Sequence, residues 1–238
     1  MFHLEEKRDD WFSSAIFAFV IVGILVIFWP SLIEPFRFFE FWTTKGSVAD
    51  AITGAWPMYL WGVSLTLFAI LFLRERSIGD KTALFAVGFV KSLKAGVFEE
   101  MAFRWIFLFS AMVMLPIFDF IFLGFMDVHI FEWIYVTLLC PIANFFTLGY
   151  LESYLVNSKD WVIGAAIISS NGRFRNGHGY QGLFGFTNSW FIGMYLYWIV
   201  FTFGIIPAIV IHFLYDFFIF TLEALFAESL PKNIFQFR

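Results

Sequence analysis

The sequence carries little charge for its length. Only 14% of its 238 residues are charged, whereas 61% are hydrophobic and the mean hydropathy is +0.80. A typical soluble domain is about half apolar and about a quarter charged, and a soluble fold of this size cannot hide so much apolar surface from water. The scarcity of charge therefore excludes an ordinary soluble protein and predicts an integral membrane protein.

Cysteine is nearly absent as well. The single cysteine, Cys140, excludes an internal disulfide and any metal site built from several cysteines. It lies in an apolar run, and we interpret it as a small buried hydrophobic residue rather than a catalytic thiol. The net charge of -4 is small and the chain has no basic block, so nucleic acid is not an expected partner.

Apolar runs long enough to cross a bilayer recur along the chain. The hydrocarbon core is about 30 Å thick, so a spanning helix needs roughly 20 apolar residues. We expect membrane helices at 11–29, 55–73, 128–150, 190–203 and 205–226. The first of these is expected to be a membrane helix rather than a cleavable signal, because charges of both signs precede it and no small-residue cleavage site follows it.

The apolar stretch 82–126 is too long for one span. We predict a break near Gly96, which separates a short helix carrying Lys91 and Lys94 from a helix over 97–114. The two lysines are expected to extend their ammonium groups to the membrane surface.

Prolines and glycines suggest further breaks. Pro116 is expected to kink or end the helix before it, and Pro141 to kink the helix that contains it. Gly204 marks the break between the last two spans. The segment 171–188 is polar and rich in glycine, so we expect it to interrupt the helices.

These patterns predict an all-α fold, a polytopic transmembrane bundle of about seven or eight membrane helices. Within it we distinguish an N-terminal two-span region at 1–81, a core at 82–228 and a tail at 229–238. Basic residues crowd the short loop 74–81, which favours the cytoplasmic side. Two spans precede that loop, so a multi-pass protein with a cytoplasmic N-terminus is expected.

Ionisable residues inside apolar runs are the candidate functional residues, because charge at bilayer depth is costly and usually faces the interior of a bundle. Glu100 and Arg104 are four residues apart, so they share a helix face and can pair. Glu99 points about 100° away from Glu100 and has no obvious local partner. Glu99 is therefore the candidate general base. The alternative is a charge cluster at the membrane interface.

Two histidines complete the set of candidate residues. His212 and Asp216 share one face of an otherwise apolar helix, where Asp216 can fix the imidazole tautomer or simply form a buried pair. His178 follows Phe174 in the polar segment, where a loop histidine is the alternative. A transporter that relays protons would bury the same residue types, so these patterns alone predict a polar centre and no particular reaction.

Taken in order, the elements Glu-Glu-x-x-x-Arg, Phe-x-x-x-His and His-x-x-x-Asp resemble the CPBP family, the CAAX-prenyl-protease and bacteriocin-processing intramembrane proteases that are also called the Abi family. The resemblance covers about 82–226 and leaves the first two spans outside. It implies a peptidase of a bacterial cytoplasmic membrane. Its substrates would be membrane-associated peptides or lipidated proteins, cleaved without a covalent intermediate.

The resemblance also implies roles for seven residues. In the family pattern one glutamate activates water with the help of a histidine, and the last motif lies where the oxyanion is stabilised. The catalytic residues would be Glu99, His178, His212 and Asp216. The residues that support the site would be Glu100, Arg104 and Phe174.

Two features differ from the usual family pattern. The segment around His178 is a poor helix former, whereas the family places this motif in an apolar helix. Asp216 stands where the family often has asparagine, and an ionised aspartate cannot donate a hydrogen bond to an oxyanion. We therefore expect Asp216 to orient His212.

Three alternatives remain open. No metal cofactor is expected, because no histidine pair lies on one helix as in His-Glu-x-x-His. The metal-dependent alternative would use zinc bound by Glu99, His178 and His212. A non-proteolytic membrane scaffold or immunity protein could keep the same fold. A transporter is less favoured because no repeated halves are seen. The lipid bilayer is an expected partner, and the sequence gives no oligomeric state.

Overall fold

The computed structural model describes residues 3–73, 80–156 and 161–227. Every regular element within these ranges is a helix, so the predicted all-α class is confirmed. The expected tail 229–238 and most of the basic loop 74–81 lie outside the described residues.

The N-terminal part contains the first expected membrane helix. Its elements are α1 (His3–Phe28), η1 (Pro30–Ile33), η2 (Phe39–Phe41), α2 (Val48–Gly54), α3 (Trp56–Phe68) and the π-helical η3 (Ala69–Leu73). We expected no helix where α2 lies. It forms because the Ser47 hydroxyl accepts a hydrogen bond from the backbone N–H of Ala49 and caps its start, while Ala51 and Ala55 are fully buried.

The predicted break near Gly96 is wrong. α4 (Lys81–Glu99), the π-helical η4 (Glu100–Phe107) and α5 (Leu108–Ile121) form one continuous helix of 41 residues. A Cβ at Gly96 would lie 2.9 Å from the backbone oxygen of Ile209 in α11. The glycine therefore marks a close contact between two helices and not the end of one.

This long helix also continues past Pro116, which lies inside α5 and does not end it. At about 1.5 Å per residue, 41 residues extend about 61 Å, roughly twice the thickness of a hydrocarbon core. Glu99 and Glu100 lie near the middle of this length, where α4 passes into η4.

The next hairpin includes the expected helix at 128–150. Its elements are η5 (Gly124–Met126), α6 (Ile130–Ile134), the π-helical η6 (Tyr135–Leu139), α7 (Cys140–Phe146) and α8 (Glu152–Leu155). Pro141, which lacks a backbone N–H, lies two residues after the end of the π segment, so the expected irregularity lies just before it. Cys140 is buried, as predicted.

The prediction that 171–188 interrupts the helices is wrong for most of its length. α9 (Trp161–Gly177) continues through the polar residues, η7 (Gly179–Gln181) forms a single turn, and α10 (Gly182–Phe203) begins directly after it. Packing explains the continuation, because Asn171 and Phe174 are buried and the Asn171 amide donates to the backbone oxygen of Trp190 at 3.1 Å.

Gly204 separates α10 from α11 (Ile205–Phe226), as predicted. Its φ is +100°, and a Cβ there would lie 2.1 Å from the backbone oxygen of Thr43. Only glycine accommodates both the backbone angle and the close approach.

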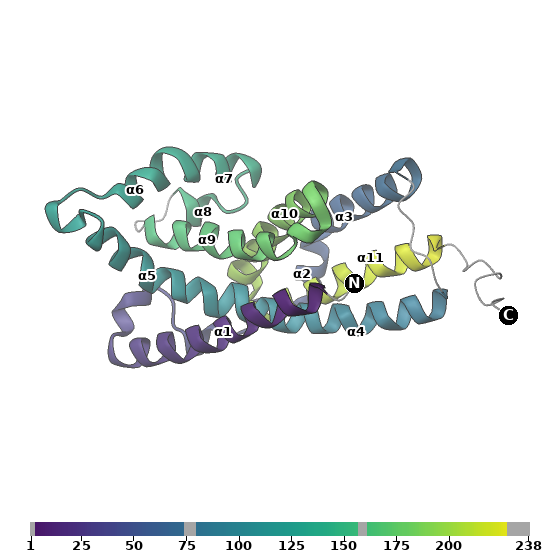
Figure 1. Cartoon of the computed structure of the whole chain (residues 1–238), viewed down its shortest axis with the longest axis horizontal. Helices are drawn as coiled ribbons and strands as arrows, with labels where there is room; N and C mark the ends of the chain where they lie inside the picture. Colours follow the sequence, from purple (N-terminus) through teal and green to yellow (C-terminus); the bar gives the residue numbers. More distant parts are fainter. Residues whose placement is uncertain (1–2, 74–79, 157–160, 228–238) are drawn as a thin grey trace.

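Figure 1 shows the long α4–α5 helix along the molecule, with α11 packed on α4 and α9 packed on α5. α10 contacts both α9 and α11 and so joins the two groups. The site residues lie where these groups meet.

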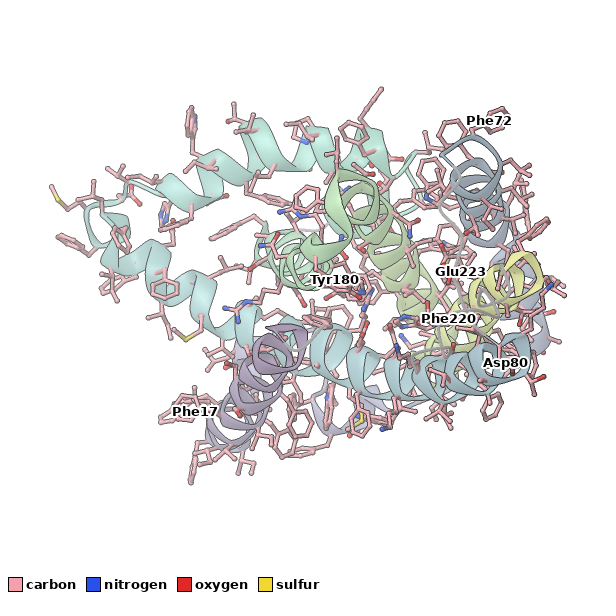
Figure 2. The ribbon with its side chains drawn as sticks, turned by 45° about the vertical axis from the view of Figure 1, so that its right-hand side comes forward. Phe17, Phe72, Asp80, Tyr180, Phe220 and Glu223 are labelled. Carbon is pink, nitrogen blue, oxygen red and sulfur yellow. The ribbon has the colours of Figure 1, made fainter. Side chains whose placement is uncertain are left out.

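Two described helices are long and apolar enough to cross a membrane, Lys81–Ile121 and Ile205–Phe226, and a third is added if α2 and α3 form one bent span. Large apolar side chains also cover the outside. Phe17 on α1 is 68% exposed and Phe72 on η3 is 72% exposed, and Figure 2 shows both pointing outward. These features support a helical membrane protein.

Candidate functional site

The seven residues singled out in the sequence come from three separate elements. The junction of α4 and η4 supplies the two glutamates and the arginine. The end of α9 supplies the phenylalanine, the residue directly after α9 is the first histidine, and the middle of α11 supplies the last pair. The fold brings all of them together: Glu99, Glu100, Arg104, Phe174, His178, His212 and Asp216.

A fully buried ion network forms the inner part of the site. Nη1 of Arg104 lies 3.2 Å from Oε1 of Glu100, and both side chains are 0% exposed. The same Oε1 lies 2.7 Å from Nδ1 of His212. A buried carboxylate needs such partners to offset the loss of its hydration. Glu100 therefore connects the cation of η4 to the imidazole of α11.

Glu100 makes the hydrogen bond to His212, whereas Asp216, which we expected to orient this ring, lies only within ion-pair distance of its other nitrogen. Oδ2 of Asp216 lies 3.6 Å from Nε2 of His212, which is beyond hydrogen-bond distance. The Glu100 carboxylate can only accept, so Nδ1 of His212 carries the donated proton. Nε2 of His212 then faces the outer part of the site.

Glu99 lies between the two histidines in that outer part. Its Oε2 atom is 4.0 Å from Nε2 of His178 and 4.0 Å from Nε2 of His212. The side chains of Glu99, His178 and Asp216 are 22%, 23% and 25% exposed, so solvent reaches all three. The buried network of Glu100, Arg104 and His212 thus adjoins three partly exposed side chains, those of Glu99, His178 and Asp216.

Phe174 positions His178. The backbone oxygen of Phe174 is 2.9 Å from Nδ1 of His178, and a carbonyl oxygen can only accept, so Nδ1 carries the proton of this hydrogen bond. In the neutral imidazole, Nε2 is then the acceptor, and it faces Glu99. The ring of Tyr180 stacks on the imidazole of His178, with 6.4 Å between the ring centres, and Figure 2 labels Tyr180 near the centre of the molecule.

Phe174 also covers Arg104. The guanidinium lies 4.1 Å from the centre of the Phe174 ring and 5.6 Å from that of Tyr197, and its Nη2 donates to the backbone oxygen of Gly193 at 3.3 Å. These contacts shield a cation that has no access to water, whereas its Nε and Nη1 atoms make no hydrogen bond within the described structure. They explain structurally why a phenylalanine lies one turn before the histidine.

The π-helical form of η4, and the residues that hydrogen-bond to it, are not expected from the sequence. The hydroxyls of Ser170 and Tyr197 both donate to the backbone oxygen of Phe103, the latter at 2.8 Å. π segments often occur at functional sites because they change the direction of successive side chains. The only sequence signal for these supporting contacts is the presence of isolated polar residues, such as Ser170, within apolar helices.

The spacing of the outer group differs from that of a zinc site. Among the described residues, no group of three or more histidine, cysteine, aspartate or glutamate side chains is arranged to hold a metal ion. Two donors on one tetrahedral zinc ion, each at about 2.1 Å, lie about 3.4 Å apart. The measured separation is 4.0 Å on both sides of Glu99. As placed, these side chains lie about 0.6 Å farther apart than two ligands of one tetrahedral zinc ion.

The same spacing suits a single water molecule. Two groups that each hydrogen-bond to one water at about 2.8 Å lie about 4.0–4.6 Å apart. The arrangement can therefore hold water against a carboxylate base, with an imidazole on each side. Comparisons of the chain with protein-family models, with curated proteins and with solved structures find no match.

Proposed function

We propose that the protein is an intramembrane endopeptidase of the CPBP type, which hydrolyses a peptide bond with water activated by Glu99. The observation that carries the proposal is the position of the Glu99 carboxylate, 4.0 Å from the Nε2 atoms of His178 and His212 and next to the buried Glu100–Arg104 pair. An unsupported acid at this depth would be costly, and its neighbours are those that hydrolysis requires.

The reaction proceeds in two steps. Glu99 takes a proton from water while the water oxygen forms a bond to the carbonyl carbon of the substrate, and negative charge develops on the carbonyl oxygen. The carbon–nitrogen bond then breaks, and Glu99 returns the proton to the leaving amine. One water is consumed, and an acid and an amine are released.

The two histidines have different tasks. Nδ1 of His178 donates to the Phe174 backbone oxygen, so Nε2 accepts a hydrogen bond from the attacking water. His212 lies against the Glu100 carboxylate, which stabilises its protonated form, and its Nε2–H donates to the developing oxyanion. An ionised Asp216 cannot be that donor.

The protein acts as a multi-pass component of a bacterial cytoplasmic membrane, with about seven or eight membrane helices and a cytoplasmic N-terminus. The long apolar helices and the exposed apolar side chains support this arrangement. Its substrates are membrane-associated peptides or lipidated proteins. Reporter fusions inserted at 74–81 and at 157–160 test the orientation, and reporters that place the first of these positions outside the cytoplasm would contradict it.

Glu99→Gln is the decisive variant. It keeps the size of the side chain and removes the base, so cleavage of membrane-anchored fluorogenic peptides should fall at least about 100-fold. Glu152→Gln is the matched control, because Glu152 is an exposed glutamate on α8, away from the site. Full activity in Glu99→Gln would remove Glu99 from the mechanism.

Two further outcomes separate the alternatives. Loss of wild-type activity on strong chelation, together with about one zinc ion per purified chain, would favour the metal-dependent mechanism. The non-proteolytic scaffold is favoured by two results together. The wild-type protein in liposomes cleaves no membrane peptide, and the phenotype of a gene deletion is complemented by the His178→Ala variant.

A further inference from the structure

The site holds more negative than positive charge. Three carboxylates surround His212, those of Glu99, Glu100 and Asp216, at 4.0, 2.7 and 3.6 Å. Arg104 neutralises one of them. With His178 neutral and His212 protonated, as the proposed reaction requires, the group keeps one excess negative charge.

Nearby cations do not correct this imbalance. The guanidinium of Arg175 lies 4.1 Å from the ring centre of Phe186, and that of Arg173 lies 5.0 Å from that of Phe107. Within the part of the chain that the structure describes, no lysine or arginine other than Arg104 forms an ion pair with a carboxylate of the site.

The excess charge lies on the open side of the site. In the described part of the chain, neither the Glu99 nor the Asp216 carboxylate accepts a hydrogen bond from a protein donor, and both are about a quarter exposed. The buried Oε2 of Glu100 also has no hydrogen-bond partner. The open side of the site therefore has carboxylate oxygens that no described protein donor fills, whereas the donors left without a hydrogen bond, Nε and Nη1 of Arg104, are fully buried.

We propose that Asp216 and Glu99 select substrates with a basic residue, lysine or arginine, next to the cleaved bond. The inference rests on the proposed function and narrows its substrate class. An ammonium or guanidinium group supplies the missing charge and the missing donors. A free C-terminal carboxylate, or an acidic residue at the same place, is repelled. The substrate is thus a cationic membrane-associated peptide cut internally.

Three matched peptides test this selectivity. Each peptide has the same membrane-anchoring segment and the same fluorophore–quencher pair. The cleaved bond is first located by mass spectrometry of the products of the glutamine peptide. The three peptides then differ only in the residue next to that bond, which is lysine, glutamine or glutamate. Wild-type kcat/KM should favour lysine over glutamate by about tenfold or more, given unit charges a few ångström apart at a partly exposed site.

Asp216→Asn removes one charge with little change in shape. The lysine-to-glutamate ratio should fall severalfold in this variant, and the ratio cancels any effect of the substitution on catalysis itself. Glu152→Gln, which removes an exposed charge on α8, should keep the wild-type ratio. A ratio near one in the wild type, or an unchanged ratio in Asp216→Asn, would overturn the proposal.

Two measurements keep the test decisive. If Asp216→Asn does not fold, the wild-type ratio is measured in about 1 M salt, where the screening length is about 3 Å, and an unchanged ratio overturns the proposal. If the wild type cuts no peptide, the hydrolase assignment fails, and equilibrium binding of the same peptides decides on charge selection alone. Equal affinity for the lysine and glutamate peptides would then exclude it.

Discussion

Replacing Arg104 by methionine tests whether the buried ion network holds the site together. Nη1 of Arg104 is 3.2 Å from Oε1 of Glu100, and both side chains are 0% exposed. Methionine fills the space over Phe174 that the arginine occupied, but it leaves the glutamate without its cation. Glu100 then keeps only the Nδ1 atom of His212, at 2.7 Å.

The expected cost follows from the burial of both partners. Removing one partner of a buried ion pair typically costs about 3–5 kcal/mol, because the other charge stays in a medium of low polarity. His212 remains at hydrogen-bond distance from Glu100, so we expect a loss near the lower end of this range, about 3 kcal/mol. For a chain of this size that corresponds to a fall of roughly 6–12 °C in the melting temperature.

The assay compares single and double variants in one detergent. Glu100→Gln combined with Arg104→Met removes both charges, so its melting temperature should recover most of what Arg104→Met alone loses. If Arg104→Met is as stable as the wild type, or if the double variant is no more stable than the single one, the network does not carry the stability assigned to it.

A further prediction concerns helix packing. Gly96→Ala should cost about 1–3 kcal/mol, because its Cβ would lie 2.9 Å from a backbone oxygen of α11. Gly23→Ala, with nothing within 4 Å, should not destabilise, and equal melting temperatures for the two variants would refute the close contact.

The helical class could be predicted from apolar runs, because lipid offers the backbone no hydrogen-bond partners and favours helices. Helix boundaries could not be predicted from glycine alone. Gly204 takes a positive φ and ends a helix, whereas Gly96 keeps the helical backbone and admits α11. Both glycines lie in apolar stretches, so the difference depends on which segment packs against each of them.

The segment 171–177 shows the same limit for helix propensity. Its asparagines and glycines disfavour a helix locally, yet α9 continues because Asn171 and Phe174 have buried partners on other helices. The π-helical η4 has no local sequence signal that we recognise. The side chains that hydrogen-bond to its Phe103 carbonyl belong to Ser170 and Tyr197, which lie far along the chain.

Within the site, spacing predicted contacts along one helix but not those between helices. The four-residue spacing correctly paired Glu100 with Arg104. The same reasoning assigned Asp216 as the partner that orients His212, whereas the atom at hydrogen-bond distance belongs to Glu100, 112 residues earlier in the chain. The three motifs could be assigned to one site only through the family resemblance, because order along the chain does not measure distance in the fold.

The two glutamates lie at the middle of a single helix whose halves belong to different packing groups. α4 packs with α11, which carries His212, whereas α5 packs with α9, which leads to His178. Bending at the junction of these halves would widen or narrow the 4.0 Å gap from His178 to Glu99 and leave the 2.7 Å contact of His212 with Glu100 in place. Because its two halves pack against different helices, the bend of this one helix fixes the distance between the side chains that each half helps to position.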